Sequence, residues 1–155
     1  FILPSEATIK TWFNIIDLWP GICNTMFHHL KAKVNCMDIS ERNCVLLLDE
    51  MKIKKGFDFH EKRQKVEGFE DLGSLGHSAT VATSALVFMV RGLLHNWKQP
   101  IAYYLTSGAL NHALLSSALD EIIEAVLNTG LKLRAIVCDQ GTNNQSAIKH
   151  KISIE

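Results

Sequence analysis

The sequence has four cysteines but lacks any pairing pattern among them. Cys23, Cys36, Cys44 and Cys138 form no C-x-x-C pair, and the seven histidines complete no zinc motif. Cys44 and Cys138 lie inside apolar runs, where a cysteine most often serves as a small buried hydrophobe. The pattern gives no support for a zinc centre, and unpaired thiols favour a reducing, intracellular setting.

An excess of one charge is also lacking. Lys+Arg and Asp+Glu both number 16, so no global positive charge indicates a nucleic-acid partner. A local basic patch or a separate DNA-binding domain stays compatible with this balance. No apolar run reaches the roughly 18 residues needed to cross a bilayer, so no membrane partner is expected. The 155 residues, 47% of them hydrophobic, are enough for one domain with a core.

The first part of the chain is predicted to be helical. Residues 4–33 begin at Ser5, a plausible N-cap, and the Trp19-Pro20-Gly21 break divides them. The helical period resumes from Ile22. We therefore expect a helical segment over residues 1–40 that leads into a core over residues 41–155. The start at Phe1 and the abrupt end at KISIE predict an excerpt, with the core incomplete at its C-terminal end.

Three apolar runs are then predicted to form strands. They are NCVLLLDEMKI (43–53), ALVFMVRGLL (85–94) and IAYYLT (101–106). Short polar links between consecutive strands favour an antiparallel meander. Between the first two, KKGFDFHEKRQ is expected to be a turn or hairpin, KVEGFED a short returning strand and GSLGHSAT a loop.

A helix and a fourth strand follow. NHALLSSALDEIIEAVLNTG has one apolar face, with Asn111 as the expected N-cap and Gly130 as the C-terminal stop. LKLRAIVCD is a strand again, and a helix between two strands favours a parallel crossover. The expected fold is therefore α/β and ribonuclease H-like: a mixed sheet of three antiparallel strands plus a parallel fourth strand, preceded by N-terminal helices. A doubly wound nucleotide-binding fold, which alternates β and α from its first strand, is the second choice.

Two of the predicted strands run into an acid. Asp49 ends the apolar stem of the first strand, and Asp139 ends the fourth. A ribonuclease H-like sheet makes these two strands neighbours, although 90 residues separate the acids. Adjacent carboxylates repel unless a divalent cation lies between them, and Mg²⁺ prefers such oxygen ligands. Two ions held this way support phosphoryl transfer on nucleic acid.

Each aspartate taken singly has a simpler interpretation, because an Asp at a strand end often caps a loop or helix. Glu50 is expected on the opposite sheet face and is not a predicted ligand. Four further acids are expected to be solvated turn residues: Asp58, Glu67, Glu70 and Asp71. Gly141 and Asn143-Asn144 most simply form a turn and a helix start.

Several stretches together resemble the P-element family of DNA transposases, including the THAP-domain transposases of animals. They are LPSEATIKTWF, LLLDEMKIKKG, KVEGFEDLG, ALVFMVRGLLHNWKQPIAYYL and IVCDQGTNNQ, and the match extends from about Leu3 to Lys149. The resemblance implies a ribonuclease H-like catalytic core with a D-D-E metal triad, in which Asp49 and Asp139 take the places of the first two catalytic acids. The family's third acid comes much later, and Glu155 is too close to Asp139 to be that residue.

The same resemblance implies cofactors and partners. Mg²⁺, or Mn²⁺, would support cleavage at transposon ends and strand transfer into target DNA. In the family GTP binds an inserted domain that is not present in this chain. Nuclear localisation and DNA as the partner are expected, and a homo-oligomer is left open. With two ligands of three, the chain alone is expected to bind metal weakly and not to cleave DNA.

Two other functions compete with this one. One is a domesticated transposase derivative that binds DNA or protein without catalysis. The other is a nucleotide-binding domain that uses the GTNN loop, which a wholly parallel sheet would support. Trp97 and Tyr103-Tyr104 could contact DNA through their rings, although core packing is the favoured interpretation.

Overall fold

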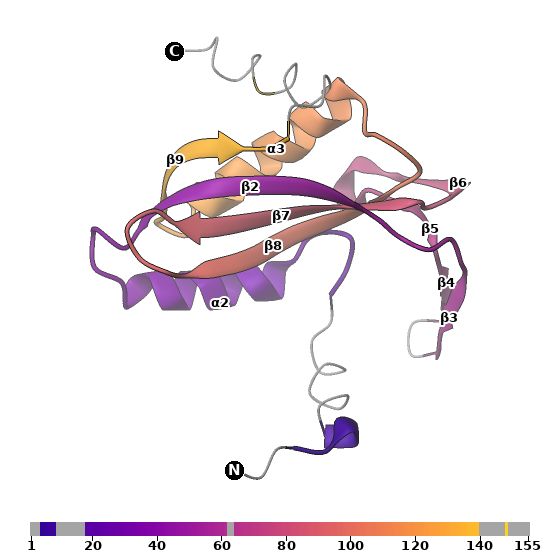
Figure 1. The fold of residues 1–155 in the computed structure, drawn as a ribbon, viewed down its shortest axis with the longest axis horizontal. Helices are drawn as coiled ribbons and strands as arrows, with labels where there is room; N and C mark the ends of the chain where they lie inside the picture. The colour runs from indigo at the N-terminus through magenta and orange to yellow at the C-terminus, as the bar shows by residue number, and fades with distance from the viewer. Residues whose placement is uncertain (1–3, 9–17, 62–63, 140–147, 149–155) are drawn as a thin grey trace.

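A mixed sheet with helices packed against it forms the molecule in this computed structural model, which describes residues 4–8, 18–61, 64–139 and 148 (Figure 1). Its four long strands run in the order β8-β7-β2-β9, with β9 at the end of the sheet. The pairs β2–β7 and β7–β8 are antiparallel, and β2–β9 is parallel. This confirms the predicted meander with a parallel fourth strand. The bounds are β2 Asn43–Lys52, β7 Ser84–Gly92, β8 Lys98–Thr106 and β9 Lys132–Val137.

The strand β2 shows why these runs form a sheet. Successive side chains of a strand point to opposite faces. Cys44, Leu46 and Leu48 are buried, whereas the intervening Val45 and Leu47 are only partly buried. One face of the sheet is therefore enclosed by protein, and the other is partly open.

The helix α3, His112–Leu127, makes the crossover to the parallel strand. The side chain of Asn111 accepts a hydrogen bond from the backbone N–H of Leu114 at 2.9 Å, as predicted for its N-cap. Gly130, with φ of 91°, follows the helix in a conformation that favours glycine. The buried side chains of α3 lie on one face: Leu115, Ala118, Leu119, Ile122 and Val126.

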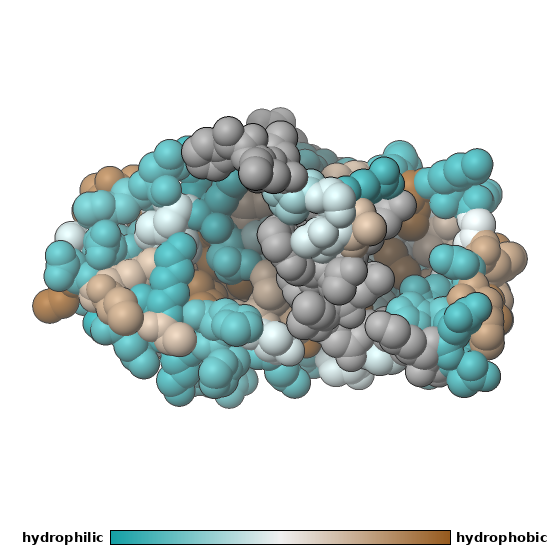
Figure 2. All heavy atoms as spheres, turned by 90° about the horizontal axis from the view of Figure 1, so that it is seen from below, coloured by the Kyte–Doolittle hydropathy of each residue, from teal (hydrophilic) through white to brown (hydrophobic). Residues whose placement is uncertain are grey.

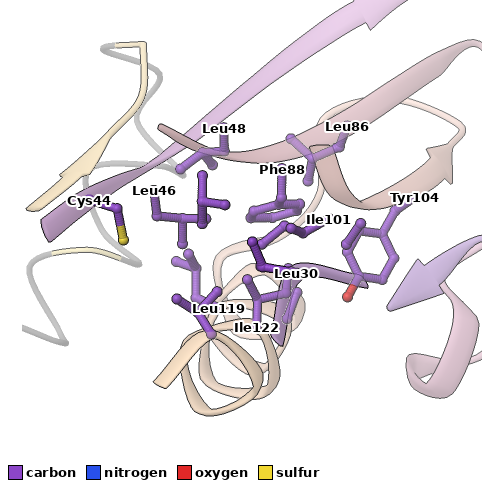
Figure 3. Close-up of a cluster of buried hydrophobic side chains, with 14 of the residues drawn as sticks. Leu30, Cys44, Leu46, Leu48, Leu86, Phe88, Ile101, Tyr104, Leu119 and Ile122 are labelled. Carbon is purple, nitrogen blue, oxygen red and sulfur yellow. The ribbon is translucent and has the colours of Figure 1, made fainter. Parts of the chain in front are cut away.

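A second helix, α2 (Asn24–Asn35), completes the core. Figure 3 shows Leu30 of α2 beside Leu119 and Ile122 of α3, all packed against the buried side chains of the strands. Helix α2 thus belongs to the same hydrophobic core as the sheet. The predicted division at residue 40 stays a prediction.

The segment before α2 differs from the expected helix. Ile22 lies in a two-residue strand, β1 (Gly21–Ile22), which pairs with β8. The helical prediction was wrong at Ile22 because Gly21, with φ of 97°, turns the chain into an extended segment that pairs with Tyr103 and Ala102 of β8. The predicted N-cap at Ser5 is confirmed, since its hydroxyl accepts from the N–H of Thr8 at 3.2 Å.

Short strands extend the sheet beyond β8. The predicted hairpin is confirmed as β3 (Asp58–His60) with β4 (Lys65–Glu67). KVEGFED is not one strand: Gly68, with φ of 116°, separates β4 from β5 (Phe69–Asp71), and a side chain there would collide with the carbonyl oxygen of Gly56. The predicted GSLGHSAT loop was wrong in its second half. After the 3₁₀ turn η2 (Gly73–Leu75), β6 (His77–Val81) pairs with β5.

The surface is uneven in polarity. Figure 2 shows a mostly polar underside, with apolar groups toward both ends, one of which holds β3 and β4. Phe59 and Val66 of that hairpin are exposed, and so is Phe57, directly before it. None of the helices that the structure describes combines the length and the apolar composition needed to cross a bilayer.

Candidate metal centre

Asp49 lies near the end of β2 on the partly open face of the sheet. It follows Val45 and Leu47 in the alternation of the strand, and it pairs with Val87 of β7. Its side chain is exposed, and one carboxylate oxygen, Oδ1, accepts from the N–H of Glu50 at 2.9 Å. A carboxylate has further lone pairs for a ligand. Asp49 therefore offers oxygen donors from a rigid strand.

The register of β2 and β9 relates Asp139 to Asp49. From Val45–Ala135 to Leu47–Val137, each β9 residue number exceeds that of its β2 partner by 90. Asp139 exceeds Asp49 by the same 90, and each lies two residues beyond the Leu47–Val137 pair. Adjacent strands are about 4.8 Å apart. The parallel register thus brings both acids to the same end of neighbouring strands.

A bulge sets this register. Cys44 pairs with Leu133 and Val45 with Ala135, so Arg134 is an extra residue on β9. The Nε of Arg134 donates to Oδ1 of Asn43 at 2.8 Å, which ties the bulge to β2. If Arg134 paired with Val45 instead of bulging, the offset would stay at 89 and Cys138 would fall opposite Asp49. The sequence did not predict this bulge, since no residue type in LKLRAIVCD marks one.

The neighbours of the two aspartates favour an all-oxygen donor set. Burial, and then the charge of Asp139, raise the pKa of the Cys138 thiol, so Cys138 stays protonated at neutral pH and is a poor metal ligand. Glu50 pairs with Leu86 on the other face of β2, which confirms that its side chain points away from Asp49. Two aspartates without a competing thiolate suit a hard cation.

The residues present fit Mg²⁺ as a partial site. Within the described part of the chain, no group of three or more His, Cys, Asp or Glu side chains could hold a metal ion. Mg²⁺ is commonly bound through one or two carboxylates, with waters and substrate phosphates as its other ligands. Gly141, Asn143-Asn144 and Glu155 lie outside the described residues.

The prediction that the remaining acids are solvated turn residues was wrong for Glu70. It is not a solvated turn residue but lies in β5, where it accepts hydrogen bonds from the N–H of Ser107 at 3.1 Å and the hydroxyls of Ser107 and Ser78 at 2.9 and 2.8 Å. These bonds, from the Ser107 N–H first and the Ser78 hydroxyl second, lower the pKa of Glu70. Asp71 is also in β5 and binds Lys65 at 3.2 Å. Both acids hold the sheet edge together.

The two tyrosines of β8 have different environments. Tyr104 is fully buried against Phe88, as core packing predicts, with ring centroids 5.7 Å apart. Tyr103 pairs with Val87 and therefore lies on the face of Asp49, where it lines a pocket. The predicted core role is confirmed for Tyr104 and wrong for Tyr103. Strand alternation was the signal that separates them.

The strand order and the crossover define a ribonuclease H-like class of fold. The antiparallel pairs exclude the wholly parallel sheet that the nucleotide-binding alternative requires. A structure described as "Drosophila P element transposase strand transfer complex" has a similar fold, with a TM-score of 0.67 and 23% sequence identity. The match covers 96% of this chain and 29% of that one.

Sequence comparison narrows the class to a family. Residues 18–151 match the family model "TNP-like, RNase H N-terminal domain", and the chain belongs to this family. The chain is 28% identical over 145 residues to the transposable element P transposase of Drosophila melanogaster. That match covers 94% of this chain and 17% of the relative, so the chain spans about a sixth of the relative's length. The recognised family and the predicted fold class are both confirmed.

Proposed function

We propose that this domain is part of a transposase catalytic core, in which Asp49 and Asp139 hold Mg²⁺ or Mn²⁺ for DNA strand cleavage and strand transfer. The observation that carries the proposal is the 90-residue offset of the β2–β9 register, which equals the separation of the two acids. The relationship to the P element transposase supports the reaction class. Bound at these carboxylates, such an ion would polarise a phosphate oxygen and activate an attacking oxygen.

The chain's own residues contribute position and charge. Asp49 lies on β2, where Val87 of β7 is its partner, so the sheet fixes the place of its backbone on this face. The bulge at Arg134 brings Asp139 level with it. Without a cation, two carboxylates at this spacing repel, and that repulsion favours cation uptake. The third acid of the proposed triad lies beyond this chain.

The wider proposal follows the family. DNA, as transposon ends and target, is the proposed partner, and the nucleus is the proposed location. GTP would act only through a domain outside this chain. We expect the 155-residue chain to bind metal without cleaving DNA, because it supplies two of three ligands. Metal-dependent nicking that is lost in Asp49→Asn would contradict this last point.

Mn²⁺ titration of the ¹⁵N-labelled chain tests the metal site. We expect paramagnetic broadening of backbone signals centred on Asp49 and Asp139, reduced by either Asp49→Asn or Asp139→Asn. Glu50→Gln is the matched control, because it removes a neighbouring charge from the opposite face and should leave the broadening unchanged. Broadening that spreads evenly over exposed acids, or that survives Asp139→Asn, would contradict the shared site and favour a binding module without catalysis.

A further inference from the structure

A pocket of about 340 Å³ opens beyond the metal centre, between the β5–β6 edge, β8 and the segment before α2. Its walls are largely apolar and aromatic, and they include Trp19, Phe69, Tyr103 and Leu105. Lys65 crosses its rim, with Nζ 5.9 Å from the centre of the Trp19 ring and 3.2 Å from Asp71. Nothing in the proposed metal chemistry uses this space.

The pocket shares a sheet face with the candidate metal ligands. Asp49 pairs with Val87, and Val87 pairs with Tyr103, so these three residues form one row across β2, β7 and β8. Residues directly opposite each other in a sheet point to the same face. With strands about 4.8 Å apart, Tyr103 is two spacings, roughly 10 Å, from Asp49. Asp139, on β9, is one spacing farther away, so the point midway between the two acids is roughly 12 Å from Tyr103, a span that one DNA strand can cover.

The charges around the pocket indicate which part of a nucleotide it suits. Glu67, Glu70 and Asp71 line it and oppose a phosphate inside. Glu70 and Asp71 also accept hydrogen bonds from Ser107, Ser78, Gly73 and Lys65. Their oxygens are therefore engaged in fixing the walls, which leaves ring stacking as the main attraction. Lys65 at the rim is the cation placed to meet a phosphate outside the pocket.

We propose that this pocket receives an unstacked nucleobase of the DNA strand whose backbone reaches Asp49 and Asp139. The base stacks against Trp19 and Tyr103, and Lys65 contacts the phosphate of the same nucleotide. This inference rests on the proposed function, because it names where a base next to the reacting phosphate lies. Since stacking faces are common to all bases, binding shows little base preference.

Titration of the ¹⁵N-labelled chain with short single strands tests the pocket. The probes are a dC tetranucleotide and an abasic tetranucleotide of equal charge. We expect dC to shift the indole N–H signal of Trp19 and the amide signal of Tyr103, and the abasic strand to leave both unchanged. The indole of Trp97, at the other end of β8 and bonded to the Glu41 carbonyl oxygen at 3.1 Å, is the internal control.

Two variants separate stacking from folding. Trp19→Ala should weaken dC binding by roughly tenfold, the effect expected for one lost stacking platform, whereas Trp19→Phe should stay within about threefold of the parent. Unchanged signals from Phe88 and Leu119 in the core show that each variant folds. Equal shifts with the abasic strand, or equal affinity of Trp19→Ala, would overturn the inference.

Two further results keep this inference distinct from the metal proposal. Mn²⁺ broadening at both aspartates without a base-dependent shift at Trp19 overturns the nucleobase pocket and leaves the metal centre standing. A base-dependent shift without that broadening supports the pocket and overturns the metal centre. The last titration uses a peptide with a single arginine, because a pocket with aromatic and acidic walls also suits a cation. Pocket signals that move with this peptide and not with dC overturn the proposal.

Discussion

Adjacent residues on the two faces of the sheet have different roles. In three neighbouring pairs, Leu46/Leu47, Asp49/Glu50 and Tyr103/Tyr104, the two side chains lie on opposite faces of the sheet, one of them partly open. The enclosed face holds Leu46 and Tyr104, both fully buried. The open face holds Asp49 and Tyr103, which belong to the candidate site. Stability and chemistry are thus divided between alternate residues of the same strands.

This division explains how the site tolerates its unfavourable groups. The two aspartates, Asp49 and Asp139, and the pocket beside Tyr103 are placed on the open face. The apolar contacts that stabilise the fold lie on the other side, where α2 and α3 cover the strands. A change on one face should therefore affect stability, and the adjacent change on the other should affect binding.

The largest expected difference is between Leu46→Ala and Leu47→Ala. Leu46 is fully buried, so its truncation leaves a cavity and should lower the free energy of unfolding by about 3–5 kcal/mol. Leu47 is partly exposed, and the same truncation should cost about 1 kcal/mol. Urea unfolding measures both. Equal losses in the two variants would show that the open face is enclosed to the same degree as the other.

The pair Tyr103/Tyr104 predicts a smaller change in the free energy of unfolding, and it is an increase instead of a loss. The hydroxyl of Tyr104 is buried without a hydrogen-bond partner among the described residues, so Tyr104→Phe should raise the free energy of unfolding by about 1 kcal/mol. Tyr103→Phe, which removes a hydroxyl 3.5 Å from the Leu18 carbonyl oxygen, should change it little. Thermal or urea unfolding at neutral pH checks both variants. A loss of stability in Tyr104→Phe would contradict the unpartnered hydroxyl.

The same pair predicts a difference at alkaline pH. Burial, and then the charge of Glu121, raise the pKa of Tyr104 from 10 to about 12. The folded state therefore holds this proton more tightly than the unfolded state does. The resulting stability is complete below pH 10 and is lost as pH rises toward 12. Tyr104→Phe should flatten this part of the stability profile, whereas Tyr103→Phe should keep the slope of the parent chain.

Much of this arrangement could be predicted from the sequence. Long alternating or apolar runs identified β2, β7, β8 and β9, and the helix between the last two gave the parallel crossover. His77–Val81 was missed because its Gly/Ser-rich flanks resemble a loop, and only pairing with β5 makes it a strand. Local composition does not report such tertiary pairing.

The candidate site was predictable in its residues but not in its geometry. An apolar run that ends in an acid singled out Asp49 and Asp139. Their alignment depends on the extra residue Arg134, and the pocket is lined by residues as distant in sequence as Trp19 and Tyr103. Both are properties of strand register and chain packing. Glu70 was misassigned for the same reason, since its partner Ser107 lies far along the chain.

The smallest effect concerns the pair Asp49/Glu50 and Mg²⁺. A ligand that binds only the folded state stabilises it by RT ln(1 + [L]/Kd), about 0.4 kcal/mol when the Mg²⁺ concentration equals Kd. The melting temperature of the parent chain should therefore rise by roughly 1–2 °C on addition of Mg²⁺. Asp49→Asn should abolish this rise, because one ligand is lost and the repulsion that favours a cation is relieved. Glu50→Gln makes the same charge change on the opposite face of the sheet and should keep the rise. An equal rise in both variants would mean that Mg²⁺ acts by general screening of surface charge. That result would contradict a specific metal site on the open face.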